Sequence, residues 1–291
     1  MGKLYVVATP IGNLGDMSPR AVETLRGVSL VVAEDTRTTG VLVRHFGVDT
    51  RLLSYHKFNE EARAPDLVAR LLAGEDIALV SDAGTPGISD PGQTLVRQAA
   101  ENGIEVVSVP GACAFAAAVS VSGFPEAPMF FGGFLPRREK EQATCFMQAA
   151  QHAPAVCCWY ESPLRIQASL CCLCAVVPEA VVCLCNDLTK KHERCYRGTP
   201  AEVLAALQEN PAAGKGEYVL AVYFATPPRM AQDIPSDEAL TPEALLVQEL
   251  AQNGGTLKNA VRVLSGRGAG GYSKNELYQA SLRLKELLSI G

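Results

Sequence analysis

Three short glycine-rich loops follow apolar segments in the first third of the chain, and their composition suits binding of a small ligand through the backbone. They span residues 9–15, 81–87 and 110–113. Glycines such as Gly84 allow tight turns and leave backbone amides and carbonyls unshielded, and Asp82 can accept a hydrogen bond from an amine or a hydroxyl. The glycine spacing matches neither the dinucleotide fingerprint nor the P-loop, so no motif supports either class of nucleotide.

Clusters of lysine and arginine are the candidates for contacts with phosphate groups. The net charge of the chain is −5, which argues against a protein that coats nucleic acid, because basic side chains drive phosphate binding by displacing counterions. Any such contact must be local, and solvated surface charge is the alternative interpretation of each cluster. The clusters are Arg137 with Arg138, the run Lys190, Lys191, His192, Arg194 and Arg197, and the C-terminal Lys258, Arg262, Arg267 and Lys274.

Cysteines could bind a metal or fill the protein interior. The chain has ten, and eight of them fall between Cys157 and Cys195. Cys171 and Cys174 have the C-x-x-C spacing of zinc ligands, but no second pair completes a set of four. We therefore predict no metal site and reduced thiols that pack as small apolar side chains.

Strands and helices alternate through the first third of the chain, as in a parallel sheet covered by helices. We predict strands at 4–8, 30–33, 77–80 and 105–109, and helices beginning at Ser18-Pro19, Pro65 and Gln93. Parallel strands end at one edge of an open α/β sheet, and ligands bind beyond that edge. The three glycine-rich loops are therefore predicted to meet there and form the site.

Composition divides the chain further. We predict an N-terminal α/β domain over residues 1–115, a second α/β domain over 116–228, a proline-rich and polar linker over 229–238, and a small helical module over 239–291. In the module, helices are predicted from Pro242 to Gly254, from Thr256 to Gly266, and from the capping box at Ser273 onward. Such a module could dock RNA, dimerise or pack on the rest of the chain.

The chain shows no sign of export or membrane insertion. No apolar segment reaches the roughly 18 residues that span a bilayer, and Met1-Gly2-Lys3 leads directly into a predicted strand instead of a signal peptide. We therefore expect a cytoplasmic protein without membrane contact.

Long motifs surround the glycine-rich loops and extend through the chain. They include Leu-Tyr-Val-Val-Ala-Thr-Pro-Ile-Gly-Asn-Leu-Gly-Asp (4–16), Ala-Glu-Asp-Thr-Arg (33–37), Ser-Asp-Ala-Gly-Thr-Pro-Gly-Ile-Ser-Asp-Pro-Gly (81–92), Tyr-Glu-Ser-Pro-Leu-Arg (160–165), Leu-Thr-Lys-Lys-His-Glu (188–193), Gly-Glu-Tyr-Val-Leu (216–220) and Ser-Lys-Asn-Glu-Leu-Tyr (273–278). In these motifs the chain resembles the bacterial small-subunit (16S) ribosomal RNA cytidine 2′-O-methyltransferase family, which has the tetrapyrrole-methylase fold.

The resemblance implies a two-domain α/β methylase, usually a homodimer, with S-adenosylmethionine between the domains and small-subunit rRNA or the 30S particle as partner. On the matching positions it implies a cofactor site made by Pro10, Asp82, Gly84, Thr85, Cys113 and Ala114. Cys113 stands where the family leads us to expect serine. A thiol is a weaker hydrogen-bond partner, so backbone contacts are expected at this position.

Methylation of a ribose hydroxyl requires a base or a nearby cation, because the hydroxyl is weakly acidic. The candidate bases are Asp35, which we favour, with Glu34 and His56; Lys190, Lys191 and His192 are further candidates for this role. The first three have alternative structural roles: the two carboxylates could cap a helix or pair with Arg37, and His56 could be a hydrogen-bonded structural residue. Substrate phosphates are expected to contact Arg37, Arg137, Arg138, Lys190, Lys191, Arg262 and Lys274.

Two other functions remain open from the sequence. A methylase of the same fold could act on a small tetrapyrrole, and a non-catalytic ribosome-assembly factor could keep the fold and bind RNA. The helical tail and the basic run favour rRNA over a small macrocycle, and the near-complete set of cofactor loops favours an enzyme over an assembly factor.

Overall fold

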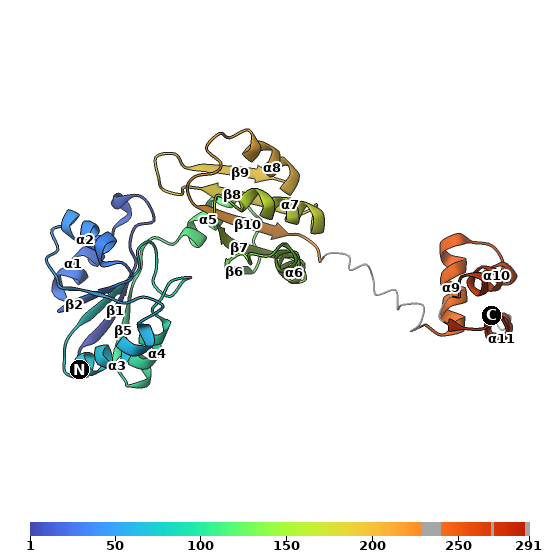
Figure 1. Cartoon of the computed structure of the whole chain (residues 1–291), viewed down its shortest axis with the longest axis horizontal. Helices are drawn as coiled ribbons and strands as arrows, with labels where there is room; N and C mark the ends of the chain where they lie inside the picture. The colour runs from blue at the N-terminus through green and yellow to red at the C-terminus, as the bar shows by residue number, and fades with distance from the viewer. Residues whose placement is uncertain (228–239, 269–270, 289–291) are drawn as a thin grey trace. The chain divides into compact units, whose positions relative to one another are not determined.

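Two compact units make up the chain, Met1–Pro228 and Arg229–Gly291. The computed structural model describes residues 1–227, 240–268 and 271–288, so the predicted linker at 229–238 lies outside the described residues. No described helix is both long and apolar enough to cross a membrane. Figure 1 shows the elements of each unit.

The first sheet is parallel and has the strand order β3-β2-β4-β1-β5. Its strands are β1 (Lys3–Val7), β2 (Leu30–Ala33), β3 (Leu52–Ser54), β4 (Ile77–Val80) and β5 (Glu105–Val109). Every residue of β2 and β4 is buried, as expected for central strands with both faces covered. These four-residue apolar runs were predicted correctly, because a continuous apolar segment of this length suits a strand buried on both sides.

Four helices cover the two faces of this sheet (Figure 1). They are α1 (Pro19–Gly27), α2 (Thr36–His45), α3 (Glu60–Leu72) and α4 (Gln93–Glu101). One core cluster contains Leu25 of α1 and Val43 of α2, and the other contains Leu67 of α3 and Leu95 of α4. The prediction that a helix begins at Pro65 was wrong: α3 begins five residues earlier, because acidic residues in its first turn favour a start there.

The second sheet is mixed and has the strand order β6-β7-β10-β8-β9. Its strands are β6 (Met129–Phe134), β7 (Ala155–Glu161), β8 (Val181–Asn186), β9 (Arg194–Gly198) and β10 (Tyr218–Phe224). Only the β6–β7 pair is parallel. One face packs on α6 (Glu139–Ala150), α7 (Ile166–Val176) and α8 (Pro200–Gln208), and the other packs on α5 (Ala114–Ser122).

The second unit is helical, as predicted. It contains α9 (Pro242–Asn253), α10 (Leu257–Arg267) and α11 (Lys274–Leu288), which share a core around Leu246 and Leu277. The capping box before α11 is confirmed, since Ser273 and Glu276 exchange hydrogen bonds. The prediction that Gly266 ends α10 was wrong: the helix runs through it to Arg267 and is capped by Gly268, whose φ of +64° is accessible to glycine without a steric cost.

Candidate active site

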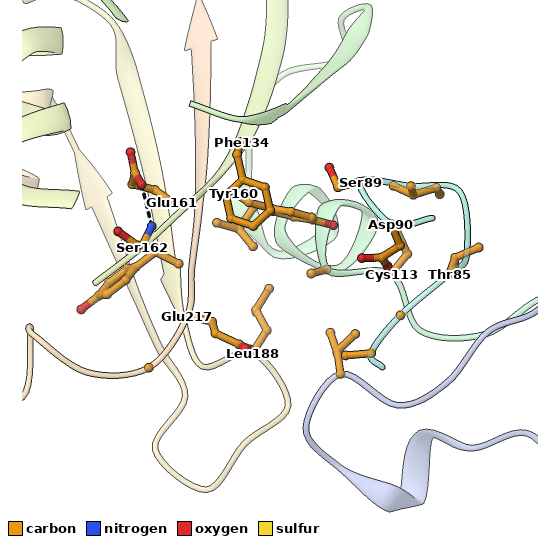
Figure 2. A pocket seen from close by; sticks show the side chains of 18 of the residues that line it. Thr85, Ser89, Asp90, Cys113, Phe134, Tyr160, Glu161, Ser162, Leu188 and Glu217 are labelled. Atoms are coloured by element: carbon orange, nitrogen blue, oxygen red, sulfur yellow. Dashed lines mark hydrogen bonds between the residues drawn. The ribbon is translucent and has the colours of Figure 1, made fainter. Parts of the chain in front are cut away.

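A cavity of about 380 Å³ lies between the strand-end loops of the first sheet and the ends of the second sheet (Figure 2). Its wall is mainly apolar and aromatic, with carboxylates at three places. The lining residues come from Ile11 of the first loop, Ala83–Thr85 and Ile88–Asp90 of the second, Cys113 and Ala114, Phe134, Tyr160–Pro163, Leu188 and Gly216–Val219. The predicted edge of the first sheet is therefore one wall of the cavity.

Backbone and side-chain hydrogen bonds join the three glycine-rich loops. Thr9 and Gly84 form a reciprocal bridge, with N···O distances of 2.8 and 3.0 Å. The Thr85 hydroxyl donates to the carbonyl of Ala112 at 3.1 Å. The loops thus meet at the end of the sheet, as the order of strands and loops predicts.

Four of the six residues expected to contact the cofactor line the cavity, namely Gly84, Thr85, Cys113 and Ala114. Pro10 and Asp82 do not line it, although the residues that follow them do. The Asp82 carboxylate instead accepts a hydrogen bond from the Asp35 amide at 2.9 Å, which links the ends of β4 and β2. Direct contact of Pro10 and Asp82 with a cofactor stays a prediction.

Glu161 is a charged residue buried at the cavity wall, and sequence reasoning did not single it out. Its side chain has no exposed surface and pairs with Arg165. It also accepts hydrogen bonds from the Ser162 amide at 2.6 Å and the Ser169 hydroxyl at 2.9 Å. These partners satisfy both carboxylate oxygens, so Glu161 holds the end of β7 in place.

Lys190 connects the first loop to the loop between β8 and β9. Its ammonium group pairs with Asp187 at 3.0 Å and with Glu217, a cavity-lining residue, at 2.9 Å. Its aliphatic stem lies over Gly12, where an added Cβ would be 2.4 Å from Lys190 Cγ. Lys190 therefore lies beside the cavity, and only a small residue fits beneath it.

Asp90 is the third carboxylate of the wall, and sequence reasoning missed it as well. It is half-buried and forms no ion pair with any residue that the structure describes. Burial, together with the charges of Glu34 and Asp82, raises the pKa of Asp90 to about 6, although a hydrogen bond with Ser81 opposes the shift. Its place in the motif at 81–92 was visible in the sequence, but its orientation was not.

The three predicted bases lie outside the cavity lining. Asp35 caps α2 by accepting from the Arg37 amide and pairs with the Arg37 guanidinium at 2.7 Å. The hydrogen bonds from Arg37 lower the pKa of Asp35 to about 2. Burial, then the charge of Asp82, raises the pKa of Glu34, and the His56 ring accepts from a backbone amide in its own loop. Their catalytic roles stay predictions.

The remaining basic residues expected to contact substrate have exposed side chains. Arg138 pairs with Glu141 at 3.2 Å, and the Arg262 guanidinium donates to Asn259 at 3.0 Å. All residues that line the cavity belong to the first unit. The exposed residues are Arg37, Arg137, Arg138, Lys191, Arg262 and Lys274.

The cysteines are all free thiols, and most of those in the second sheet are buried. Burial raises the pKa of the Cys158 thiol to about 12, which keeps it protonated at neutral pH. Within the described ranges no group of three or more histidine, cysteine or acidic side chains is arranged to hold a metal ion.

Comparison with known proteins finds methyltransferases similar to this chain along nearly its whole length. Residues 3–204 match the family model for tetrapyrrole (corrin/porphyrin) methylases. The chain is 44% identical to ribosomal RNA small subunit methyltransferase I of Synechocystis sp., over 98% of this chain and 99% of that protein. It is 42% identical to the protein of the same name from Escherichia coli O157:H7, over 97% and 95% of the two chains.

Solved structures share the fold at low identity. The methyltransferase CobJ aligns with a TM-score of 0.57 and 16% identity, over 77% of this chain and 94% of that one. Diphthine synthase aligns with the same TM-score and identity, over 76% and 89%. At this identity the similarity concerns the arrangement of strands and helices alone.

Proposed function

The chain belongs to the tetrapyrrole methylase family and, within it, to the ribosomal RNA small subunit methyltransferase I proteins, and from this premise we propose that it methylates the 2′-hydroxyl of a cytidine ribose in 16S ribosomal RNA. The methyl donor is S-adenosylmethionine. The observation that carries the proposal is a cavity formed by the predicted cofactor loops, in a chain 44% identical over nearly its whole length to a protein named for rRNA methylation.

The cavity fits S-adenosylmethionine in size and chemistry. Its volume of about 380 Å³ falls in the range of small-molecule sites, about 300–1,000 Å³. Ile11, Ile88 and Leu188 offer apolar surface to the adenine ring. When bound, the cofactor supplies an electrophilic methyl group on a positively charged sulfur. The loop residues Pro10, Asp82, Gly84, Thr85, Cys113 and Ala114 are proposed to surround it.

The RNA is proposed to contact a limited set of basic residues around the cavity and on the helical unit. With a net charge of −5, the chain has little general attraction for RNA, so the shape of an assembled 30S particle must add to local phosphate contacts. Lys190 lies beside the cavity, and the exposed residues proposed to join it are Arg37, Arg137, Arg138, Lys191, Arg262 and Lys274. We also propose that the protein acts as a homodimer in the cytoplasm.

Methylation of isolated 30S particles tests the function directly. Particles from cells that lack this protein are incubated with the purified protein and S-adenosylmethionine, and nuclease digests of the 16S rRNA are examined by mass spectrometry. We expect one new 2′-O-methylcytidine. A modification on a base, or none at all, would contradict the proposal.

Calorimetric titration with S-adenosylmethionine separates the two remaining alternatives. Binding of the cofactor without methylation of 30S particles would favour a small-molecule methylase. A folded protein that binds no cofactor would indicate an assembly factor.

A further inference from the structure

We propose that Asp90 is the general base of the reaction and accepts the proton of the ribose hydroxyl during methyl transfer. The inference rests on the proposed function and concerns a residue that no motif in the sequence marks as a base. It favours Asp90 over Asp35, Glu34 and His56, which lie outside the cavity lining, and it assigns a role to a carboxylate on the cavity wall that forms no ion pair with a described residue.

The position of Asp90 brings it close to both sheets. It lies in the loop between β4 and α4, one residue after Ser89. The Ser89 hydroxyl lies close to Gly133 of β6, because a Cβ added to Gly133 would be 3.2 Å from Ser89 Oγ. Figure 2 shows Asp90 beside Cys113, with the hydroxyl end of Tyr160 pointing toward it. A group held between the two sheets in this way can reach a substrate in the cavity.

The other ionisable oxygens of the wall are unsuited to accept the proton. Glu161 is fully buried and already bound to Arg165 and two further donors. Glu217 is paired with Lys190, and 77% of its side chain is exposed. Burial raises the pKa of Tyr160 and of Tyr218, so both phenols stay neutral and cannot act as bases at physiological pH.

The surroundings of Asp90 make its carboxylate a better base than an ordinary aspartate. The groups that face it are Glu34 at the end of β2, Ser81 and Asp82 at the end of β4, and Tyr160 at the end of β7. The two acidic neighbours disfavour its charge, and the serine hydroxyl stabilises it. With a pKa of about 6 it is mostly ionised at pH 7, yet it binds a proton more readily than exposed aspartates do.

The step balances without any further reactant. The ribose oxygen forms a bond to the methyl carbon, the carbon–sulfur bond breaks, and its electron pair stays on sulfur to give a neutral thioether. The hydroxyl proton goes to the Asp90 carboxylate, which later releases it to water. The chain's other residues hold the two reactants in line, which supplies most of the rate gain in such reactions.

The test compares Asp90→Asn with the unchanged protein in single-turnover methylation of 30S particles, beside Asp66→Asn, which removes an exposed charge from α3. We expect Asp90→Asn to lower the rate about 10²- to 10⁴-fold, with the Kd for S-adenosylmethionine changed less than about threefold. Asp66→Asn should match the unchanged protein. A loss of cofactor affinity as large as the loss of rate would overturn the proposal and make Asp90 a ligand of the cofactor ammonium.

The pH profile gives a second readout that a structural role would not produce. A base must be ionised, so the rate of the unchanged protein should fall about tenfold per pH unit below pH 6. Glu34→Gln removes a repulsive charge and so lowers the pKa of Asp90. The fall in rate should therefore move to lower pH in this variant. An unmoved pH profile would contradict the inference even if Asp90→Asn did not fold. Absence of methylation by the unchanged protein would refute the proposed function itself, whereas an active Asp90→Asn variant would refute only the role of Asp90.

Discussion

Arg165 compensates the one acidic side chain of the cavity wall that is fully enclosed. Glu161 has no exposed surface, and Arg165 is 28% exposed. We expect Arg165→Met to lower the free energy of unfolding by about 3 kcal/mol, because it leaves a buried carboxylate without its charge partner. Urea denaturation of the purified protein measures the change.

Arg138→Met is the matched control for this prediction. It breaks a pair with Glu141 in which both side chains are exposed, at 84% and 51%, so a change within about 0.5 kcal/mol is expected. Equal effects of the two substitutions would show that the burial of Glu161 does not determine the stability of this pair.

The sequence placed the site but did not identify every side chain that faces it. Gly84 and Cys113 were predicted in the site because they follow strands that end at one edge of the sheet, and both line the cavity. Asp35 was favoured as base from its place after a strand, yet the same place also makes it the cap of α2. Asp90 and Glu161 were missed because side-chain orientation and burial at the cavity wall depend on contacts between distant segments, which no local pattern describes.

The β8–β9 hairpin brings two thiols together at the base of the loop that carries Lys190. Cys185 and Cys195 are directly opposed on the two strands, with 3.3 Å between their sulfur atoms. We expect the oxidant diamide to join them in a disulfide, in which the two thiols lose two protons and two electrons and diamide is reduced to a hydrazine. Burial raises the pKa of Cys195, so the reaction should be faster at higher pH, where more thiolate is present.

Mass spectrometry of unreduced tryptic peptides detects this cross-link. Cys195→Ser should abolish it, while Cys171→Ser, which removes an exposed thiol from α7, should leave it unchanged. Oxidation that links other cysteines and leaves this pair free would show that the hairpin holds the sulfurs apart.

Elements with continuous apolar sequences were predicted better than short or polar ones. Strands β2 and β4 are entirely buried, and their sequences show it. β3 has only three residues, all half-buried, and α2 begins with four polar or basic residues, so neither produced a clear pattern. The end of α10 was misplaced because two glycines lie close together, and only the backbone conformation shows which of them stops the helix.

At the scale of the whole chain, sequence reasoning was most successful. The long motifs at 4–16 and 81–92 led to a methylase family and fold, and the family match over residues 3–204 and the relatives above 40% identity confirm both. Such motifs are specific because several loops must fit one cofactor together. The boundary between the two α/β domains, the dimer and the RNA contacts stay predictions, since they depend on surfaces that carry no comparable motif.

Removal of the helical unit should separate cofactor binding from action on the ribosome. Every residue that lines the cavity lies between Ile11 and Val219, and the second unit has its own core around Leu246 and Leu277. A chain that ends at Pro228 is therefore expected to fold and to bind S-adenosylmethionine with a Kd within about twofold of the full chain's. Its methylation of 30S particles should fall at least about tenfold, since each lost phosphate contact weakens RNA binding.

The full-length double variant Arg262→Gln with Lys274→Gln tests the charges alone: it should lose part of this activity, and its activity should depend less on salt concentration. Equal methylation by the shortened and full chains would show that the helical unit does not dock RNA, and loss of cofactor binding would show that the first unit depends on the second.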